Sequence, residues 1–149
     1  MNEHPSSSVV QQEAEAVLLS ALARKLGCNL EPHSIRLNDK SSIQIDGFSA
    51  DGRVLCEVYA HVGTLRGGQL DKVATDILKL NLASGRKGGI WRKILLFADQ
   101  QACKMLKGSS WLAEACKDSH VEIEVADITE QTRQKIKAVQ KRQKMVNAE

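Results

Sequence analysis

Apolar positions along the chain recur at helical spacing in four regions. The first is the clearest, because Val10, Ala14 and Leu18 follow one face, while Ser8 and Gln11 resemble a capping box at its start. Glycines that end or interrupt the spacing mark the limits of these regions. The predicted helices cover residues 9–26, 68–82, 100–117 with a break near Gly108 that Ser109 could cap, and a last stretch from Thr129.

Between the helices, apolar and polar residues alternate with the period of a β-strand. Ile43 and Ile45 alternate with polar neighbours, and the same pattern runs from Val54 to Val62. A nearly continuous apolar run from Ile90 to Ala98 is typical of a strand covered on both faces. Two weaker strands are expected near 33–37 and over 121–125.

The order of these elements is helix, three strands, helix, strand, helix, strand, helix. The connection through the 68–82 helix has the length of a right-handed parallel crossover. The sequence therefore predicts an α/β fold with three layers, in which helices cover both faces of a central mixed sheet. We expect a disordered segment over 1–8, one domain over 9–128 and a basic helix over 129–149.

Composition limits the class of protein. The chain has 149 residues, of which 42% are hydrophobic and 26% charged, as in an ordinary globular domain. No apolar run reaches the roughly 20 residues that span a membrane, and no secretory leader is visible, so we expect a cytoplasmic protein. The four cysteines have no metal-site spacing and are expected to be free thiols, with Cys56 a small buried residue.

The Asp51-Gly52 dipeptide predicts a tight hairpin turn with positive φ at both positions. This turn pairs positions whose numbers add up to 103, so Asp46 lies opposite Glu57. The same register matches Ile45 with Val58 and Ile43 with Ala60, Gln44 with Tyr59, and Ser42 with His61.

Two carboxylates in opposed positions lie about 5 Å apart and repel each other. A divalent cation such as Mg²⁺ or Mn²⁺ would relieve this repulsion, because Mg²⁺ takes one or two carboxylates together with waters and substrate phosphates. Two other interpretations stay open: Asp46 and Glu57 could be a solvated acidic pair without a function, and Arg53 could neutralise them.

The order of elements, with Asp46 and then Glu57 on a hairpin, resembles the PD-(D/E)xK nuclease superfamily, which includes restriction endonucleases and archaeal Holliday-junction resolvases. The resemblance covers about Val9–Ala98 and implies a restriction-endonuclease-like core. More narrowly, the string from Glu57 to His61, followed by Gln69 and Lys72, is similar to a group of small, uncharacterised bacterial proteins.

The resemblance implies a set of metal ligands. Asp46 and Glu57 would be ligands through their carboxylates, and Val58 through its carbonyl oxygen. A glutamate of the first helix, Glu15 or Glu13, would complete the site; spacing to the end of the helix favours Glu15, and either could instead be a solvated helical residue.

The chain departs from the superfamily at the motif lysine, which is replaced by Tyr59. In the superfamily that lysine positions the attacking water and stabilises developing charge. Lys72 is the candidate substitute, with Gln69 beside it in the first turns of the helix. Lys79, two turns farther along, is expected to contribute much less. Lys72 could instead simply pair with Asp76, four residues on.

Charge is concentrated at the C-terminal end. The whole chain carries +3, whereas the last twenty-one residues carry six basic and two acidic side chains. Such a helix could bind phosphate or could be a solvated surface. His61 could likewise contact phosphate, or be a partly buried histidine with a hydrogen-bond partner.

Two functions follow from these expectations. One is a nuclease that uses Mg²⁺ or Mn²⁺ to hydrolyse nucleic-acid phosphodiesters, with DNA favoured over RNA. The other is a non-catalytic domain of the same fold, which binds nucleic acid or a protein partner, or forms a homodimer. The retained acidic pair favours the first function, and Tyr59 favours the second.

Overall fold

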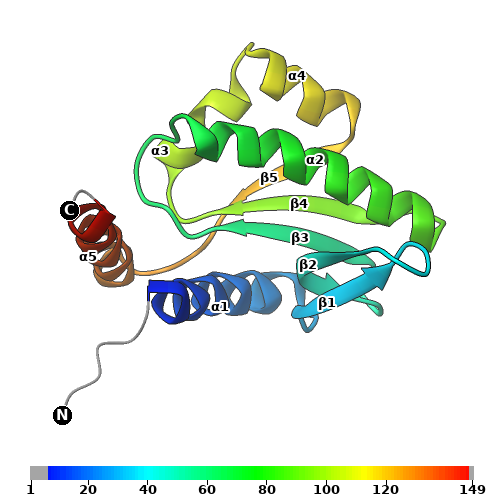
Figure 1. The fold of residues 1–149 in the computed structure, drawn as a ribbon, viewed down its shortest axis with the longest axis horizontal. Coiled ribbons are helices and arrows are strands. Elements are labelled where there is room, and N and C mark those ends of the chain that lie inside the picture. Colours follow the sequence, from blue (N-terminus) through cyan, green and yellow to red (C-terminus); the bar gives the residue numbers. More distant parts are fainter. Residues whose placement is uncertain (1–6, 148–149) are drawn as a thin grey trace.

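The computed structural model describes the backbone of residues 7–147 and the side chains of residues 11–142. In this part of the chain five strands form one mixed sheet in the order β1-β2-β3-β4-β5. Helices α1 and α5 lie on one face, and α2, α3 and α4 on the other (Figure 1). The predicted three-layer α/β/α fold is therefore confirmed. The strands are β1 (Glu31–Arg36), β2 (Ser42–Ser49), β3 (Val54–Tyr59), β4 (Arg92–Phe97) and β5 (Val121–Val125); the helices are α1 (Ser7–Leu26), α2 (Gly68–Lys87), α3 (Gln100–Cys103) with a 3₁₀ turn (Lys104–Lys107), α4 (Trp111–Asp118) and α5 (Glu130–Asn147).

The strand directions agree with the predicted crossover. Strand β2 runs antiparallel to both β1 and β3, whereas β3, β4 and β5 are parallel to one another. Helix α2 connects β3 to β4 and covers one face of the sheet. Helix α1 covers the other face, so every residue of β3 is buried, and the predicted alternation of buried and exposed residues is absent from this strand.

The β2–β3 hairpin has the predicted register, but a different turn. Gly47 pairs with Cys56 and Ser49 with Val54, as the sum of 103 requires. Positive φ occurs at Arg53, at 53°, and not at Asp51 or Gly52. The side chain of Arg53 holds the residue in this conformation, because its guanidinium donates to the carbonyl oxygens of Ile90 and Gly88.

A β-bulge in β2 changes the pairing beyond Gly47. Glu31 pairs with Phe48 and His33 with Ile45, so Asp46 and Gly47 together oppose the single residue Pro32. The extra residue turns Ile45 to the same face as Phe48, in the core beneath α2. The predicted matches of Ile45 with Val58 and of Ile43 with Ala60 are therefore wrong, because Val58 belongs to the core beneath α1.

Strand β3 also ends earlier than predicted, at Tyr59 instead of Val62. The chain after Tyr59 leaves the sheet and runs to the start of α2. Neither Gln44 and Tyr59 nor Ser42 and His61 are among the pairs of the β2–β3 ladder in the described residues, because the bulge ends the pairing at Gly47. The opposition of Asp46 and Glu57 thus depends on side chains and not on a ladder pair.

Other element ends differ by up to five residues. Helix α2 continues to Lys87 instead of Leu82, β1 covers 31–36 instead of 33–37, and exposed Ile90 precedes β4. Ser110, not Ser109, caps α4, by accepting from the amide of Ala113. Helix α1 already includes residues 7 and 8, which were predicted to be disordered; that prediction for 1–6 lies outside the described residues.

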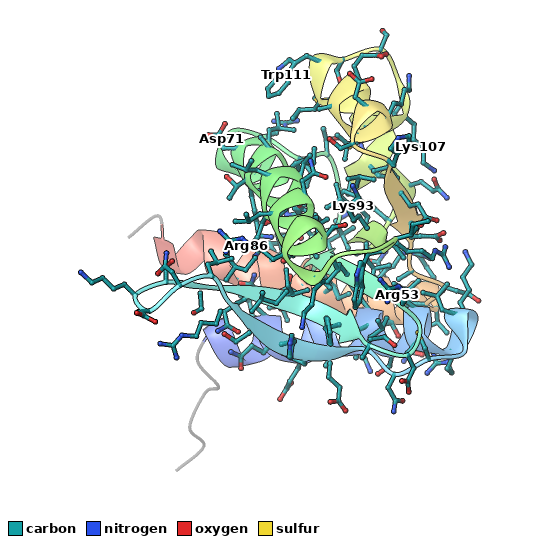
Figure 2. All side chains as sticks on the ribbon, turned by 90° about the vertical axis from the view of Figure 1, so that its right-hand side faces the viewer. Arg53, Asp71, Arg86, Lys93, Lys107 and Trp111 are labelled. Carbon is teal, nitrogen blue, oxygen red and sulfur yellow. The ribbon has the colours of Figure 1, made fainter. Side chains whose placement is uncertain are left out.

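Three further features of the fold concern the cysteines, Trp111 and the hydrophobicity of the helices. Cys56 is fully buried, and all four cysteines are free. Trp111, the first residue of α4, is exposed and points away from the helix (Figure 2). No helix within the described part of the chain is long and apolar enough to cross a membrane.

Candidate functional site

The bulge in β2 places the Asp46 carboxylate in the gap that it opens between β2 and β3. Asp46 Oδ2 accepts a hydrogen bond from the backbone N–H of Val58, at 3.0 Å. This bond substitutes for a ladder bond that the bulge removes. The carboxyl groups of Asp46 and Glu57 lie within hydrogen-bonding reach of each other. The two acids predicted to be neighbours are thus brought together.

Glu57 is almost completely enclosed, with 1% of its surface exposed. Burial raises the pKa of the Glu57 carboxyl, and its hydrogen bond and repulsion with Asp46 raise it further, to about 9, although Lys79 lowers it in part. Two carboxylates side by side do not both ionise easily, so the Asp46–Glu57 pair holds a proton at neutral pH. A cation bound there would replace that proton.

Lys79 supplies the cation at this site. Its Nζ lies 2.8 Å from Glu57 Oε1, in an ion pair that lacks good hydrogen-bond geometry. Burial lowers the pKa of Lys79, but the contact with Glu57 and the charges of Asp76 and Asp46 outweigh burial, so the net shift is upward. The ammonium therefore stays charged while 23% of the side chain is exposed.

The structure places Lys79, and not Lys72, against Glu57. Helix α2 begins beyond the Tyr59 end of β3 and runs back over the sheet, so its first turn is far from Glu57. Seven residues of helix carry the chain ~10 Å, which brings Lys79 on the same helix face over Glu57. The prediction from the sequence considered Lys72 only in relation to the Tyr59 end of the strand and expected much less of Lys79.

Lys72 belongs to a second cluster, centred on Asp76. Asp76 Oδ2 accepts from Tyr59 Oη at 2.6 Å and from Lys72 Nζ at 2.7 Å, and Asp76 is only 2% exposed. The Lys72 ammonium also lies 4.3 Å from the centre of the Tyr59 ring. Burial and Asp76 raise the pKa of the Tyr59 hydroxyl, which therefore stays protonated as a donor.

Asp76 connects the two clusters. Its Oδ1 is 3.9 Å from Lys79 Nζ, while its Oδ2 holds Lys72 and Tyr59. Sequence reasoning treated Asp76 only as an alternative partner of Lys72. The 3-4-3 spacing of Gln69, Lys72, Asp76 and Lys79 puts all four on one helix face, but it does not show which strand residues that face meets.

Glu15 is the helix α1 glutamate nearest to this site. It is half-buried, whereas Glu13 is exposed. Burial and the charge of Asp46 raise the pKa of Glu15, while a hydrogen bond from Gln11 and the charge of Lys72 lower it. Glu15 approaches Asp46 from the α1 side of the sheet, while Glu57 faces α2.

His61 lies between two glutamine side chains after the end of β3. Gln69 Nε2 is 2.9 Å from His61 Nδ1, and Gln140 Nε2 is 3.4 Å from His61 Nε2. Because Gln69 Oε1 accepts from the Arg66 amide, its Nε2 faces the ring as a donor, so Nδ1 is the accepting nitrogen. Gln69 therefore orients His61 through one end of its amide and is held at the other end by the Arg66 backbone.

The basic helix α5 has two kinds of cation. Arg133 turns inward and donates to the carbonyl oxygens of Ala98 and Ala126, so it anchors the helix instead of facing solvent. It was predicted to contact phosphate with the rest of the segment. The side chains that do face solvent are Lys135, Lys137, Lys141 and Arg142, while the side chain of Lys144 lies outside the described residues.

The Asp46–Glu57 pair has the oxygen donors that a hard divalent cation prefers. Mg²⁺ binds one or two carboxylates and retains water ligands, a requirement that Asp46 and Glu57 meet. Among the described residues no group of three acidic, histidine or cysteine side chains is arranged to hold a metal. Glu15 is thus separate from the pair, since Asp46 lies between it and Glu57.

Comparisons of the chain with family models, curated proteins and solved structures find no match. Interpretation of the site therefore depends on the side chains themselves.

Proposed function

We propose that this protein is a divalent-metal-dependent nuclease of the PD-(D/E)xK type, in which Lys79 of α2 replaces the motif lysine. The observation that carries the proposal is the 2.8 Å contact between Lys79 Nζ and Glu57 Oε1, beside Asp46. A pair of acids and a lysine are thus present together, although Tyr59 occupies the position expected for the lysine.

Each side chain has a distinct part in the proposed reaction. Asp46 and Glu57 would hold Mg²⁺ or Mn²⁺, which when bound acidifies water and neutralises charge on the phosphate. Lys79 keeps its ammonium beside these acids and can donate to a phosphate oxygen as charge develops there. Asp76 adds a second carboxylate 3.9 Å from the Lys79 ammonium, which helps to keep Lys79 charged.

Cleavage assays on single- and double-stranded DNA and RNA with Mg²⁺ or Mn²⁺ test the proposal. Lys79→Ala should reduce the cleavage rate by about 100-fold or more, as expected when a charge-stabilising group is lost. Lys117→Ala is the matched control, because Lys117 is exposed on α4. Equal cleavage by the Lys79→Ala variant and the wild type would show that Lys79 has no such part.

A second function has its own supporting observation. Glu57 is sealed from solvent, and the Asp46–Glu57 pair is already neutralised by one proton and the Lys79 ammonium, as in a structural cluster. A non-catalytic domain that binds nucleic acid or a protein partner would retain such a pair for stability. This alternative predicts neither Mn²⁺ binding nor cleavage, with nucleic-acid binding intact. In either case four free thiols favour the reducing cytoplasm.

A further inference from the structure

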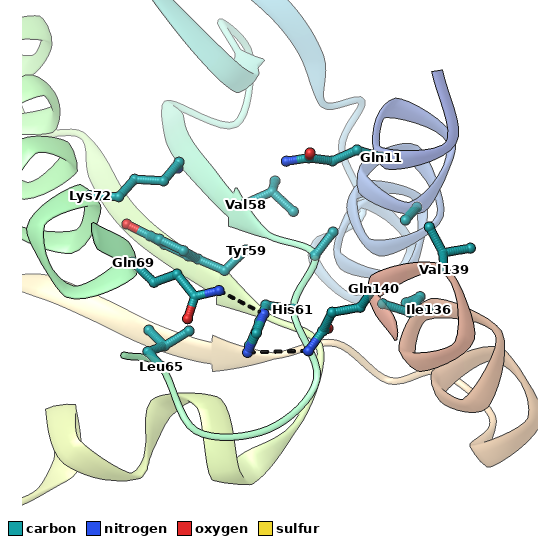
Figure 3. A pocket seen from close by; sticks show the side chains of 12 residues that line it. Gln11, Val58, Tyr59, His61, Leu65, Gln69, Lys72, Ile136, Val139 and Gln140 are labelled. Atoms are coloured by element: carbon teal, nitrogen blue, oxygen red, sulfur yellow. Dashed lines mark hydrogen bonds between the residues drawn. The ribbon is translucent and has the colours of Figure 1, made fainter. Parts of the chain in front are cut away.

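A cleft of about 260 Å³ opens beside the acidic pair. It lies between α1, the first turn of α2, the end of β3 and α5 (Figure 3). Tyr59 and Lys72 border it, whereas Asp46, Glu57 and Lys79 do not. Tyr59 points to the same face of β3 as Glu57, two residues away, so the cleft is next to the proposed nuclease site and distinct from it.

The polar groups of the cleft are held in fixed orientations. Gln69 Oε1 accepts from the Arg66 amide at 3.0 Å, which directs its Nε2 towards His61. Gln140 makes a pair of 2.9 Å bonds with the backbone N–H and C=O of Val62. Figure 3 shows Gln69 and Gln140 on the two sides of His61. A ligand would therefore meet preorganised amides and an imidazole.

Positive charge lies around the cleft. Its lining includes Lys72, which is 47% exposed and pairs with Asp76 at 2.7 Å, and no aspartate or glutamate. Helix α5, which forms one wall through Ile136, Val139 and Gln140, also carries the exposed cations Lys135, Lys137, Lys141 and Arg142. Such a surface attracts an anionic ligand and raises its local concentration.

Size and chemistry together define the ligand class. The volume falls just below the ~300–1,000 Å³ of sites for drug-sized ligands, so one small polar unit fits. A nucleotide combines an anionic phosphate with a base that has hydrogen-bonding edges and an apolar face. Lys72 suits the phosphate, the second N–H of the Gln69 amide suits a base edge, and Leu65, Ile136 and Val139 suit the base face.

We propose that this cleft binds one nucleotide of a nucleic-acid strand, next to the phosphodiester that the Asp46–Glu57 site would cleave. Its position relative to the cleaved bond depends on the proposed function, whereas the binding itself does not. The nucleotide could be part of a strand or a free nucleoside monophosphate, and the two sources share the same chemistry.

Fluorescence anisotropy with a labelled oligonucleotide, at low salt and with EDTA to prevent cleavage, measures binding alone. Gln69→Glu should raise the Kd about tenfold, because it places a negative charge in the cleft and removes an amide donor. Gln131→Glu adds the same charge at an exposed position on α5 and is the matched control.

A second variant avoids dependence on the His61 contact. Gln11 lines the cleft from an exposed position on α1, so Gln11→Trp fills the mouth without entering the core. It should also weaken oligonucleotide binding about tenfold. Competition by an unlabelled nucleoside monophosphate separates the sources: displacement shows that a free nucleotide fits, and its failure shows that the strand is required.

The proposal is overturned if the wild type does not bind at low salt, or if both cleft variants bind as tightly as Gln131→Glu. Failure of the nuclease proposal gives a different result, because binding would then depend on the cleft while no metal condition produces cleavage. Metal-dependent cleavage by the wild type, together with weaker binding in both cleft variants, would support the two proposals by separate measurements.

Discussion

Tyr59 donates its hydroxyl hydrogen to Asp76 across the interface between β3 and α2, at 2.6 Å. This bond fixes the helix residue that stands one turn before Lys79, and Lys79 in turn contacts Glu57. Tyr59, which stands at the position where a lysine was expected, thus supports Lys79, the lysine that lies beside the acidic pair.

Tyr59→Phe should destabilise the fold, because it leaves the buried Asp76 without one of its donors. We expect the free energy of unfolding to fall by about 1–2 kcal/mol. Urea unfolding measures this change, with Asp76→Ala as the background for a double-mutant cycle. In that background Tyr59→Phe should have little further effect; equal losses in both backgrounds would contradict the coupling.

Stability should depend on pH through Glu57. The pKa of Glu57 is raised in the folded protein from 4.5 to about 9, so the folded state holds this proton more tightly than the unfolded chain. The stability that this Glu57 proton contributes is complete below about pH 4.5 and is lost as the pH rises to about 9. Glu57→Gln stays neutral and should remove this loss, so its stability relative to wild type should increase from pH 5 to pH 9.

Glu122 provides a control, because its pKa is shifted in the opposite direction to that of Glu57. A hydrogen bond and the charge of Arg92 hold the pKa of Glu122 below its usual value. Its contribution is present at neutral pH and is lost as the pH falls through the lowered pKa. Glu122→Gln should therefore follow the wild type in the range from pH 6 to pH 9. A parallel response of both variants would argue against the buried proton.

Mn²⁺ should stabilise the folded protein, an effect that can be measured without an assay of activity. A ligand that binds only the folded state raises the melting temperature with its concentration. Asp46→Asn should abolish that rise, because it removes one of the two proposed carboxylate ligands. Asp51→Asn, at the exposed turn of the same hairpin, should retain it. Calorimetric titration gives the affinity directly, and an unchanged response of Asp46→Asn would contradict metal binding here.

Gly47 should resist any larger residue. A Cβ atom at Gly47 would lie 2.6 Å from Leu19 Cδ2 of α1, so one of the two must move. We expect Gly47→Ala to reduce the free energy of unfolding by about 1–3 kcal/mol, as overpacking does in other cores. In a Leu19→Ala background the same change should cost much less, since the clashing methyl is absent. Thermal unfolding of the four proteins tests this.

Different substitutions in helix α5 should affect either stability or nucleic-acid binding. Arg133→Ala removes bonds to two backbone carbonyls and should destabilise the fold. Replacing exposed Lys137 and Lys141 with alanine should leave stability unchanged, weaken nucleic-acid binding and reduce its dependence on salt. A salt dependence unaffected by both replacements would mean that α5 does not contact phosphate.

The sequence predicted those features that depend on local pattern. The order of elements followed from apolar periodicity, and the Ser49–Val54 register followed from the Asp51-Gly52 turn. The bulge at Asp46 was not predictable, because it requires one unpaired residue that alternation does not reveal. Its result, the approach of Asp46 to Glu57, agreed with the prediction although the route was different.

The position of Lys79 could not be predicted because it depends on the path of α2 over the sheet. Spacing places Lys72 and Lys79 on one helix face, but only the direction of the helix decides which of them reaches Glu57. Arg133 is a similar case, since a basic residue in a basic helix gives no sign that it binds carbonyls at strand ends.

The two anchors of α5, Arg133 and Gln140, lie seven residues apart, and both bind main-chain atoms: Arg133 the carbonyls of Ala98 and Ala126, and Gln140 both backbone groups of Val62. Main-chain atoms are present whatever side chain a position carries. Core residues beneath the helix could therefore change during evolution while α5 kept its place on the sheet. We expect these two residues to tolerate substitution less than the apolar residues around them.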